Sequence, residues 1–126
     1  MVNKPIIILG APRSGTNALR DSLASIDNFI TWPCDEINYI WRHHNLLFPS
    51  DELKKEHATS KVKNYIKRKF SEIIIESEKN QNKRKDLTLV EKTCANCLRV
   101  DFVDTIFPKA KYIYIKRDPF DTIYSS

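Results

Sequence analysis

Three short hydrophobic runs stand out along the chain. They lie at 5–10 (PIIILG), 87–93 (LTLVEKT) and 111–117 (KYIYIKR), and each contains β-branched or aromatic residues. Apolar runs of this length without a helical repeat are typical of buried strands in parallel sheets. The pattern therefore predicts three strands, the first of which ends at Gly10.

The segments between these runs repeat their hydrophobic residues at helical spacing. From Asn17 onward, leucine and isoleucine recur at i, i+4 and i+7, which places them on one stripe of a helix. Residues 27–49 are rich in aromatic side chains and predict a short strand or loop followed by a short helix. Further helices are predicted over 50–80, 96–107 and from 118 onward. We expect Ser50 to cap the longest of them, with a break near Thr59.

The order of these elements is strand–helix, helices, strand–helix, strand–helix. Such alternation predicts the α/β class, with a central parallel sheet and covering helices. We expect a single domain over 1–126. The sequence stops at Ser126, within the first turns of the last predicted helix, so we also expect this domain to be incomplete at its C-terminus.

Composition and charge narrow the classes of function. The chain has 126 residues, 41% of them hydrophobic and 29% charged, as in globular proteins. No apolar run has membrane-spanning length, and the first one is too short for a secretory signal, so we expect a soluble cytoplasmic protein. The net charge of +5 favours an anionic partner. Nucleic acid is not expected, because the basic connector 79–86 lacks interleaved aromatic residues.

Cysteine and histidine do not indicate a metal site. Cys94 and Cys97 form a lone C-x-x-C, whereas a zinc site needs about four ligands. The three histidines are not at metal-ligand spacing from one another. We therefore expect no metal and interpret Cys94 and Cys97 as plain thiols at a helix start.

The loop GAPRSGT at 10–16 connects the first strand to the first helix. Its amides and the helix N-terminus concentrate N–H dipoles at one place, which suits a phosphate. Gly15 allows close approach of the backbone, and Arg13 adds a charged donor. Neutral donors are added by Ser14, Thr16 and Asn17.

The same loop departs from the Walker pattern G-x-x-x-x-G-K-[ST]. Gly10 and Gly15 fit, but Thr16 and Asn17 stand where lysine and a hydroxyl residue are required. Hydrolysis of ATP through bound magnesium is therefore a poor fit. A P-loop nucleotide kinase remains only a less favoured alternative.

A second anion site is predicted at the end of the third strand. Arg117 leaves this strand at the carboxyl edge of the sheet, where ligands bind in parallel α/β folds. Ser125 follows eight residues later, about two turns into the next predicted helix. The two side chains are placed to hold one phosphate between them.

These motifs resemble those of the sulfotransferase family. PIIILGAPRSGTNAL looks like the family's 5′-phosphosulfate loop, and YIKRDPFDTIYSS looks like its 3′-phosphate motif. The stretch VEKTCANCLRVDFVDTIFPKAKYIYIKRDP is similar to the approach to that motif in tyrosylprotein, heparan and many bacterial sulfotransferases. The resemblance covers the first loop and most of 87–126, but not 48–86. It implies a P-loop-like three-layer α/β/α fold.

The resemblance also implies a donor and a reaction. The donor is 3′-phosphoadenylyl sulfate (PAPS), whose sulfuryl group passes to a hydroxyl or amine acceptor of unknown type. Residues 13–17 would hold the 5′-phosphosulfate, and Arg117 and Ser125 the 3′-phosphate. Arg13 stands where many members have lysine. A catalytically inert nucleotide-binding fragment is the alternative from another class.

Sulfuryl transfer needs a base for the acceptor proton and cations for the transferring group. By similarity to the heparan and tyrosylprotein groups, Glu36 is the predicted base. Asp35, His43 and His44 stay open as alternatives. Lys92, at the end of the second predicted strand, is expected to act at the sulfuryl group or the acceptor, with Glu91 pointing away.

Overall fold

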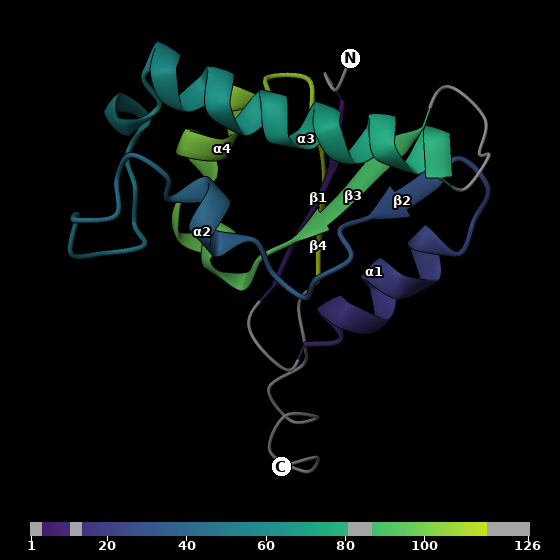
Figure 1. Cartoon of the computed structure of the whole chain (residues 1–126). Helices are drawn as coiled ribbons and strands as arrows, with labels where there is room; N and C mark the ends of the chain where they lie inside the picture. The colour runs from purple at the N-terminus through teal and green to yellow at the C-terminus, as the bar shows by residue number, and fades with distance from the viewer. Residues whose placement is uncertain (1–3, 11–13, 81–86, 116–126) are drawn as a thin grey trace, which may run out of the picture.

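The computed structural model describes residues 4–10, 14–80 and 87–115. Within these ranges the strands form one parallel sheet in the order β2-β3-β1-β4 (Figure 1). The strands are β1 (Ile6–Leu9), β2 (Phe29–Thr31), β3 (Thr88–Lys92) and β4 (Lys111–Tyr114). The predicted α/β class with a central parallel sheet is confirmed. The helix predicted from residue 118 lies outside the described residues.

Helices cover both faces of this sheet. They are α1 (Thr16–Ala24), α2 (Asn38–Trp41), α3 (Ser60–Asn80) and α4 (Val100–Ile106), with 3₁₀ turns η1 (Lys55–His57) and η2 (Cys94–Leu98). In Figure 1, α1 lies on one side of the strands, and α2, α3 and α4 lie on the other. This is the predicted three-layer α/β/α arrangement.

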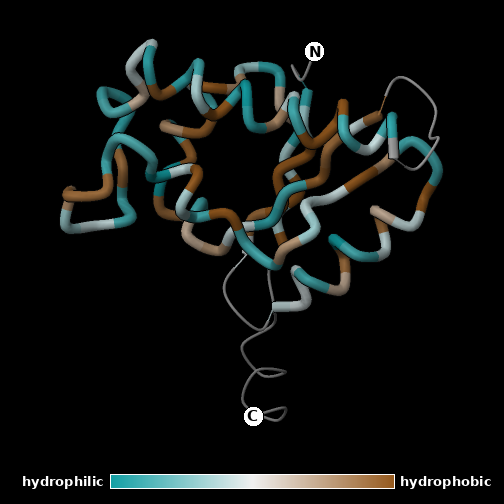
Figure 2. The backbone as a smooth tube through the Cα atoms, in the orientation of Figure 1, coloured by the Kyte–Doolittle hydropathy of each residue, from teal (hydrophilic) through white to brown (hydrophobic). Residues whose placement is uncertain are grey.

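The main core lies between the sheet and the second helical layer. Ile7 and Leu9 of β1 and Leu89 of β3 point into it, as expected for alternate residues of a strand. Aromatic rings fill the centre, where Phe70 of α3 lies 5.4 Å from Trp41 and 4.8 Å from Phe107 between ring centroids. Figure 2 shows the hydrophobic positions gathered on the central strands and on the helices that face them.

The helix predicted over 50–80 begins only at Ser60, so its first part was predicted wrongly. Ser50 Oγ accepts the amide of Glu52 at 3.0 Å, which makes a local turn rather than a helix cap. Thr59 Oγ1 accepts the amide of Val62 at 3.3 Å and so caps α3 instead. The predicted break near Thr59 is therefore the true start of the helix.

The helix predicted over 96–107 is also divided. Residues 94–98 form η2, and α4 begins only at Val100. Arg99 between them has φ −146°, outside the helical range. Its buried side chain donates to Asn96 Oδ1 at 2.8 Å. This contact fixes a bend that hydrophobic spacing does not reveal.

No helix in the described part of the chain is both long enough and apolar enough to cross a membrane.

Candidate active site

The chain leaves neighbouring strands of the sheet in opposite directions. After β1 it passes to α1 on one face, and after β3 it passes through η2 to α4 on the other face. In parallel α/β sheets, such a divergence opens a crevice at the carboxyl ends of the two strands, where ligands bind. The loop after β1 and the end of β3 therefore share one site.

Two glycines shape the loop after β1 for different reasons. A Cβ on Gly10 would lie 2.7 Å from Thr16 Cγ2 and 2.8 Å from Ser14 Oγ, so the loop closes tightly over this residue. Gly15 has φ +90°, a left-handed conformation that favours glycine, and the space beside it is open.

The start of α1 is suited to an anion. Gly15 is its N-cap residue, no side chain among the described residues caps the helix, and the first turn carries no acidic residue. The first amides of a helix lack intrahelical partners and attract negative charge. Ser14 is half-buried, Thr16 is buried, and Asn17 is exposed in the first turn. The predicted donors Arg13, Arg117 and Ser125 lie outside the described residues.

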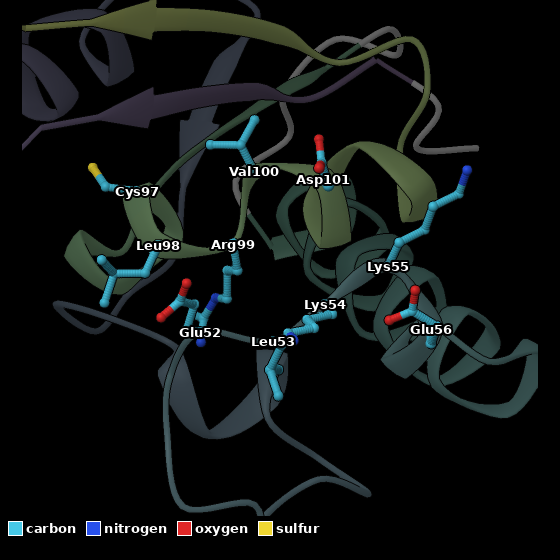
Figure 3. Close-up of a pocket in the computed structure, with 10 residues that line it drawn as sticks. All are labelled: Glu52, Leu53, Lys54, Lys55, Glu56, Cys97, Leu98, Arg99, Val100 and Asp101. Atoms are coloured by element: carbon cyan, nitrogen blue, oxygen red, sulfur yellow. The ribbon is translucent and has the colours of Figure 1, made fainter.

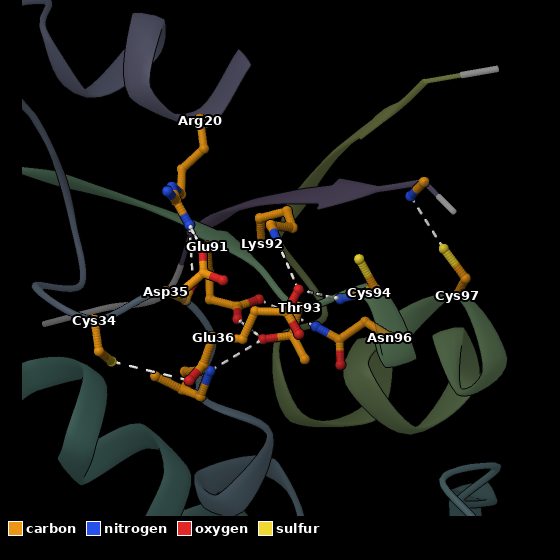
Figure 4. A network of polar contacts seen from close by, with 12 residues as sticks. Arg20, Cys34, Asp35, Glu36, Glu91, Lys92, Thr93, Cys94, Asn96 and Cys97 are labelled. Atoms are coloured by element: carbon orange, nitrogen blue, oxygen red, sulfur yellow. Dashed lines mark hydrogen bonds and ion pairs between the residues drawn. The ribbon is translucent and has the colours of Figure 1, made fainter. Parts of the chain in front are cut away.

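The turn η2 contacts the loop after β1. Cys97 Sγ accepts the amide of Gly10 at 3.0 Å (Figure 4). Neither Cys97 nor Cys94 forms a disulfide bond. Among the described residues, no group of three or more histidine, cysteine, aspartate or glutamate side chains is arranged to hold a metal ion.

Lys92 and Glu36 meet at the end of β3. Lys92 Nζ lies 2.5 Å from Glu36 Oε2, and the lysine side chain is only 3% exposed, against 31% for the glutamate. The amide of Cys94 donates to the same oxygen at 3.3 Å. The structure thus brings the predicted base into contact with the predicted catalytic lysine, two residues that are far apart in the sequence.

These contacts decide the charge of Glu36. Partial burial by itself would raise its pKa, but the hydrogen bonds from Lys92 and Cys94 and the lysine charge outweigh that effect. The pKa of Glu36 therefore lies below its ordinary value. The carboxylate is ionised at neutral pH, as a proton acceptor must be.

The alternative bases are placed differently. Arg20 of α1 donates to Asp35 Oδ1 at 3.0 Å, and the Asp35 side chain is 70% exposed. The Arg20 hydrogen bond lowers the pKa of Asp35. His43 stacks on Tyr65 of α3 at 3.7 Å between centroids, and His44 packs edge-on against His43. The two histidines thus pack at the end of α2 against α3.

Glu91 lies on the opposite face of β3 from Lys92 and is fully buried. Its carboxylate accepts hydrogen bonds from the Thr93 hydroxyl and from Asn96 Nδ2. Burial raises the pKa of Glu91 to about 7, although the Thr93 hydrogen bond and the charge of Arg99 oppose the rise.

The raised pKa of Glu91 predicts a pH-dependent stability. An acid with a higher pKa in the folded chain stabilises the fold most below its unfolded pKa, and this advantage is lost as the pH rises through the folded value. Between about pH 5 and about pH 8, wild type should lose roughly 2–3 kcal/mol of unfolding free energy relative to Glu91→Gln. Urea denaturation of both proteins at the two pH values measures this difference. Equal pH slopes would contradict a buried, titrating Glu91.

A pocket of about 490 Å³ adjoins the site (Figure 3). Cys97, which contacts the loop after β1, also forms part of its wall. The exposed hydrophobic side chains of Leu98 and Val100 line it as well. Lysine and acidic side chains both surround it, so its walls favour neither an anionic nor a cationic ligand.

The buried polar network around Arg99 was not identified from the sequence. Arg99 is 1% exposed and donates to Asn96 and, from Nη2, to Asn38 Oδ1 at 2.6 Å. Burial lowers its pKa to about 10, although the charge of Asp51 opposes the fall. A charged residue between apolar neighbours in the segment CLRVDF is the one signal that points to Arg99.

Comparison with known proteins supports the sequence resemblance. A family model described as the sulfotransferase family matches residues 5–126. No curated protein matches the chain.

Proposed function

The chain belongs to the sulfotransferase family, and we propose that it transfers a sulfuryl group from PAPS to a hydroxyl or amine acceptor. The observation that carries the proposal is the 2.5 Å contact between Lys92 Nζ and Glu36 Oε2. It places an ionised carboxylate and a cation together at the carboxyl edge of the sheet, beside the loop after β1.

The loop after β1 is the proposed site for the 5′-phosphosulfate. No described side chain caps the start of α1, and the space beside Gly15 is open. Both features support this assignment, because sulfate and phosphate oxygens accept hydrogen bonds from backbone amides. Arg13 would add charge there. Arg117 and Ser125 are proposed to hold the 3′-phosphate, on the sequence motif alone.

The proposed reaction is an in-line displacement at sulfur. The acceptor hydroxyl or amine gives its proton to Glu36 as its oxygen or nitrogen bonds to sulfur. The bond between sulfur and the bridging phosphate oxygen breaks, and adenosine 3′,5′-bisphosphate leaves with the electron pair. Lys92 stabilises the negative charge on the transferring group and leaving oxygen, so that charge complementarity lowers the barrier. In this proposed reaction, side chains of the protein supply both the proton acceptor and the stabilising positive charge.

Thr16 argues against a nucleotide kinase. It occupies the Walker lysine position, and its side chain is buried against Gly10, 2.7 Å from where a Cβ would lie. A buried methyl group there cannot reach a β- or γ-phosphate, as the Walker lysine does.

Ligand-dependent melting tests the donor class. Adenosine 3′,5′-bisphosphate at a hundredfold excess over its Kd should stabilise the chain by about 3 kcal/mol, whereas ATP with magnesium should not. Differential scanning fluorimetry measures both. Stabilisation by ATP with magnesium alone would instead support a kinase.

Transfer of labelled sulfate then separates an enzyme from an inert binding module. PAPS carrying ³⁵S is incubated with the chain and with p-nitrophenol, glucosamine or a tyrosine peptide as acceptor. Labelled product from any of them supports the proposal. Binding of the bisphosphate without transfer to any acceptor supports the inert module.

A further inference from the structure

Three consecutive residues at the end of β3 hold the same short segment. Lys92 Nζ contacts the Glu36 carboxylate, and the amide of Cys94 donates to the same oxygen. Between them, Thr93 Oγ1 accepts the amide of Ile37, the residue after Glu36, at 3.4 Å. Figure 4 shows the side chains of this group converging at the end of the strand. The Glu36 carboxylate and the backbone behind it are therefore held from the same strand end.

The Thr93 hydroxyl is itself held in one orientation. It donates its hydrogen to Glu91 Oε1, so its lone pairs are left to receive the Ile37 amide. Asn96 Nδ2 donates to Glu91 Oε2 at 3.1 Å and fixes the other carboxylate oxygen. Thr93, Glu91 and Asn96 are each no more than 1% exposed, so water does not compete for these bonds.

Ile37 connects the buried Thr93–Glu91 hydrogen bonds to Glu36, because Ile37 directly follows Glu36 in the chain. It is the N-cap residue of α2, and within the part of the chain that the structure describes no side chain caps that helix. The bends at 33–35 before Glu36 form no strand or helix that could fix the peptide. Two exposed contacts also reach the backbone around Glu36: Arg20 Nη1 donates to the Asp35 carbonyl at 2.8 Å, and Cys34 Sγ donates to the Glu36 carbonyl at 3.9 Å. The contact from the Ile37 amide to the Thr93 hydroxyl is buried, so water does not compete with it.

We infer that Thr93 is a positioning residue for the acceptor base Glu36, and that Glu91 orients the Thr93 hydroxyl for this role. The effect of Thr93 on catalysis rests on the proposed function. That the Thr93 hydroxyl keeps the Glu36 carboxylate against Lys92 and Cys94 does not depend on the reaction.

The test compares Thr93→Val, which removes the hydroxyl at nearly constant shape, with Thr93→Ser, which keeps it. The Glu36 side-chain carboxyl is titrated by ¹³C NMR in the whole chain. In Thr93→Val its pKa should rise toward the ordinary glutamate value, because the contacts to Lys92 and Cys94 loosen. Thr93→Ser should restore the wild-type titration. Thr93→Ala serves in place of the valine variant if that protein does not fold.

The rate of sulfuryl transfer provides the second readout. Loss of one positioning hydrogen bond should lower kcat about tenfold in Thr93→Val, with recovery in Thr93→Ser and an unchanged Kd for adenosine 3′,5′-bisphosphate. A lower melting temperature with an unchanged Glu36 titration would overturn the inference, because Thr93 would then be only structural. A wild-type chain that transfers no sulfate would overturn the proposed function, while the titration would still decide the role of Thr93.

Discussion

Glu36→Gln should lower kcat for sulfuryl transfer by about 10²- to 10⁴-fold, the usual contribution of a general base. Glutamine keeps an oxygen that can accept from Lys92 and from the amide of Cys94, so the local geometry is largely retained. It cannot take a proton from the acceptor at neutral pH. Steady-state transfer of ³⁵S from PAPS measures the loss, and binding of adenosine 3′,5′-bisphosphate should stay within about twofold of wild type.

Asp35→Asn is the matched control for this variant. It makes the same chemical change one residue earlier, on a carboxylate that is held by Arg20 and largely exposed. Its kcat should stay close to wild type. A large loss in Asp35→Asn together with a small one in Glu36→Gln would move the base to Asp35. Small losses in both would exclude this pair and direct attention to His43 and His44.

Arg99→Met should destabilise the fold by about 3–5 kcal/mol, which is typical when one partner is removed from a buried charged network. Methionine fills much of the space but donates no hydrogen bond. Asn96 and Asn38 each lose a donor from Arg99, and Asp51 loses an ion-pair partner at 3.9 Å. Urea denaturation at neutral pH measures the change in unfolding free energy.

Arg68→Met controls for the loss of an arginine as such. Arg68 lies on the exposed face of α3 and pairs only loosely with Glu72, at 4.0 Å. Its replacement should change the unfolding free energy by less than about 1 kcal/mol. If the two variants are equally stable, the buried network does not stabilise the fold.

The strands and their alternation with helices could be predicted from the sequence, because burial on both faces leaves compact β-branched runs such as PIIILG. Helix starts were harder. Ser50 and Thr59 are both good capping residues, and only the packed structure shows that Thr59 caps α3. The break at Arg99 depends on a side chain buried by distant residues, which local spacing cannot express.

The candidate site was predictable only in part, for a related reason. Glu36 and Lys92 were named from motif resemblance, and the structure places them in contact. The supporting roles of Thr93, Cys94 and Cys97 could not be named, because each depends on a partner more than fifty residues away in the chain. Backbone amides such as those of Cys94 and Gly10 also carry no signature in a sequence.

The long separation of these partners has a consequence for how the protein folds. The contact from Gly10 to Cys97 spans 87 residues and that from Lys92 to Glu36 spans 56. The first depends on β3 pairing with β1 and the second on β3 pairing with β2. Neither can form early from local structure, and loop-closure entropy opposes both until the sheet assembles. The Glu36–Lys92 pair should consequently form in a single cooperative step late in refolding, and a peptide ending before β3 would contain Gly10 and Gly15 but lack the proposed partner of Glu36.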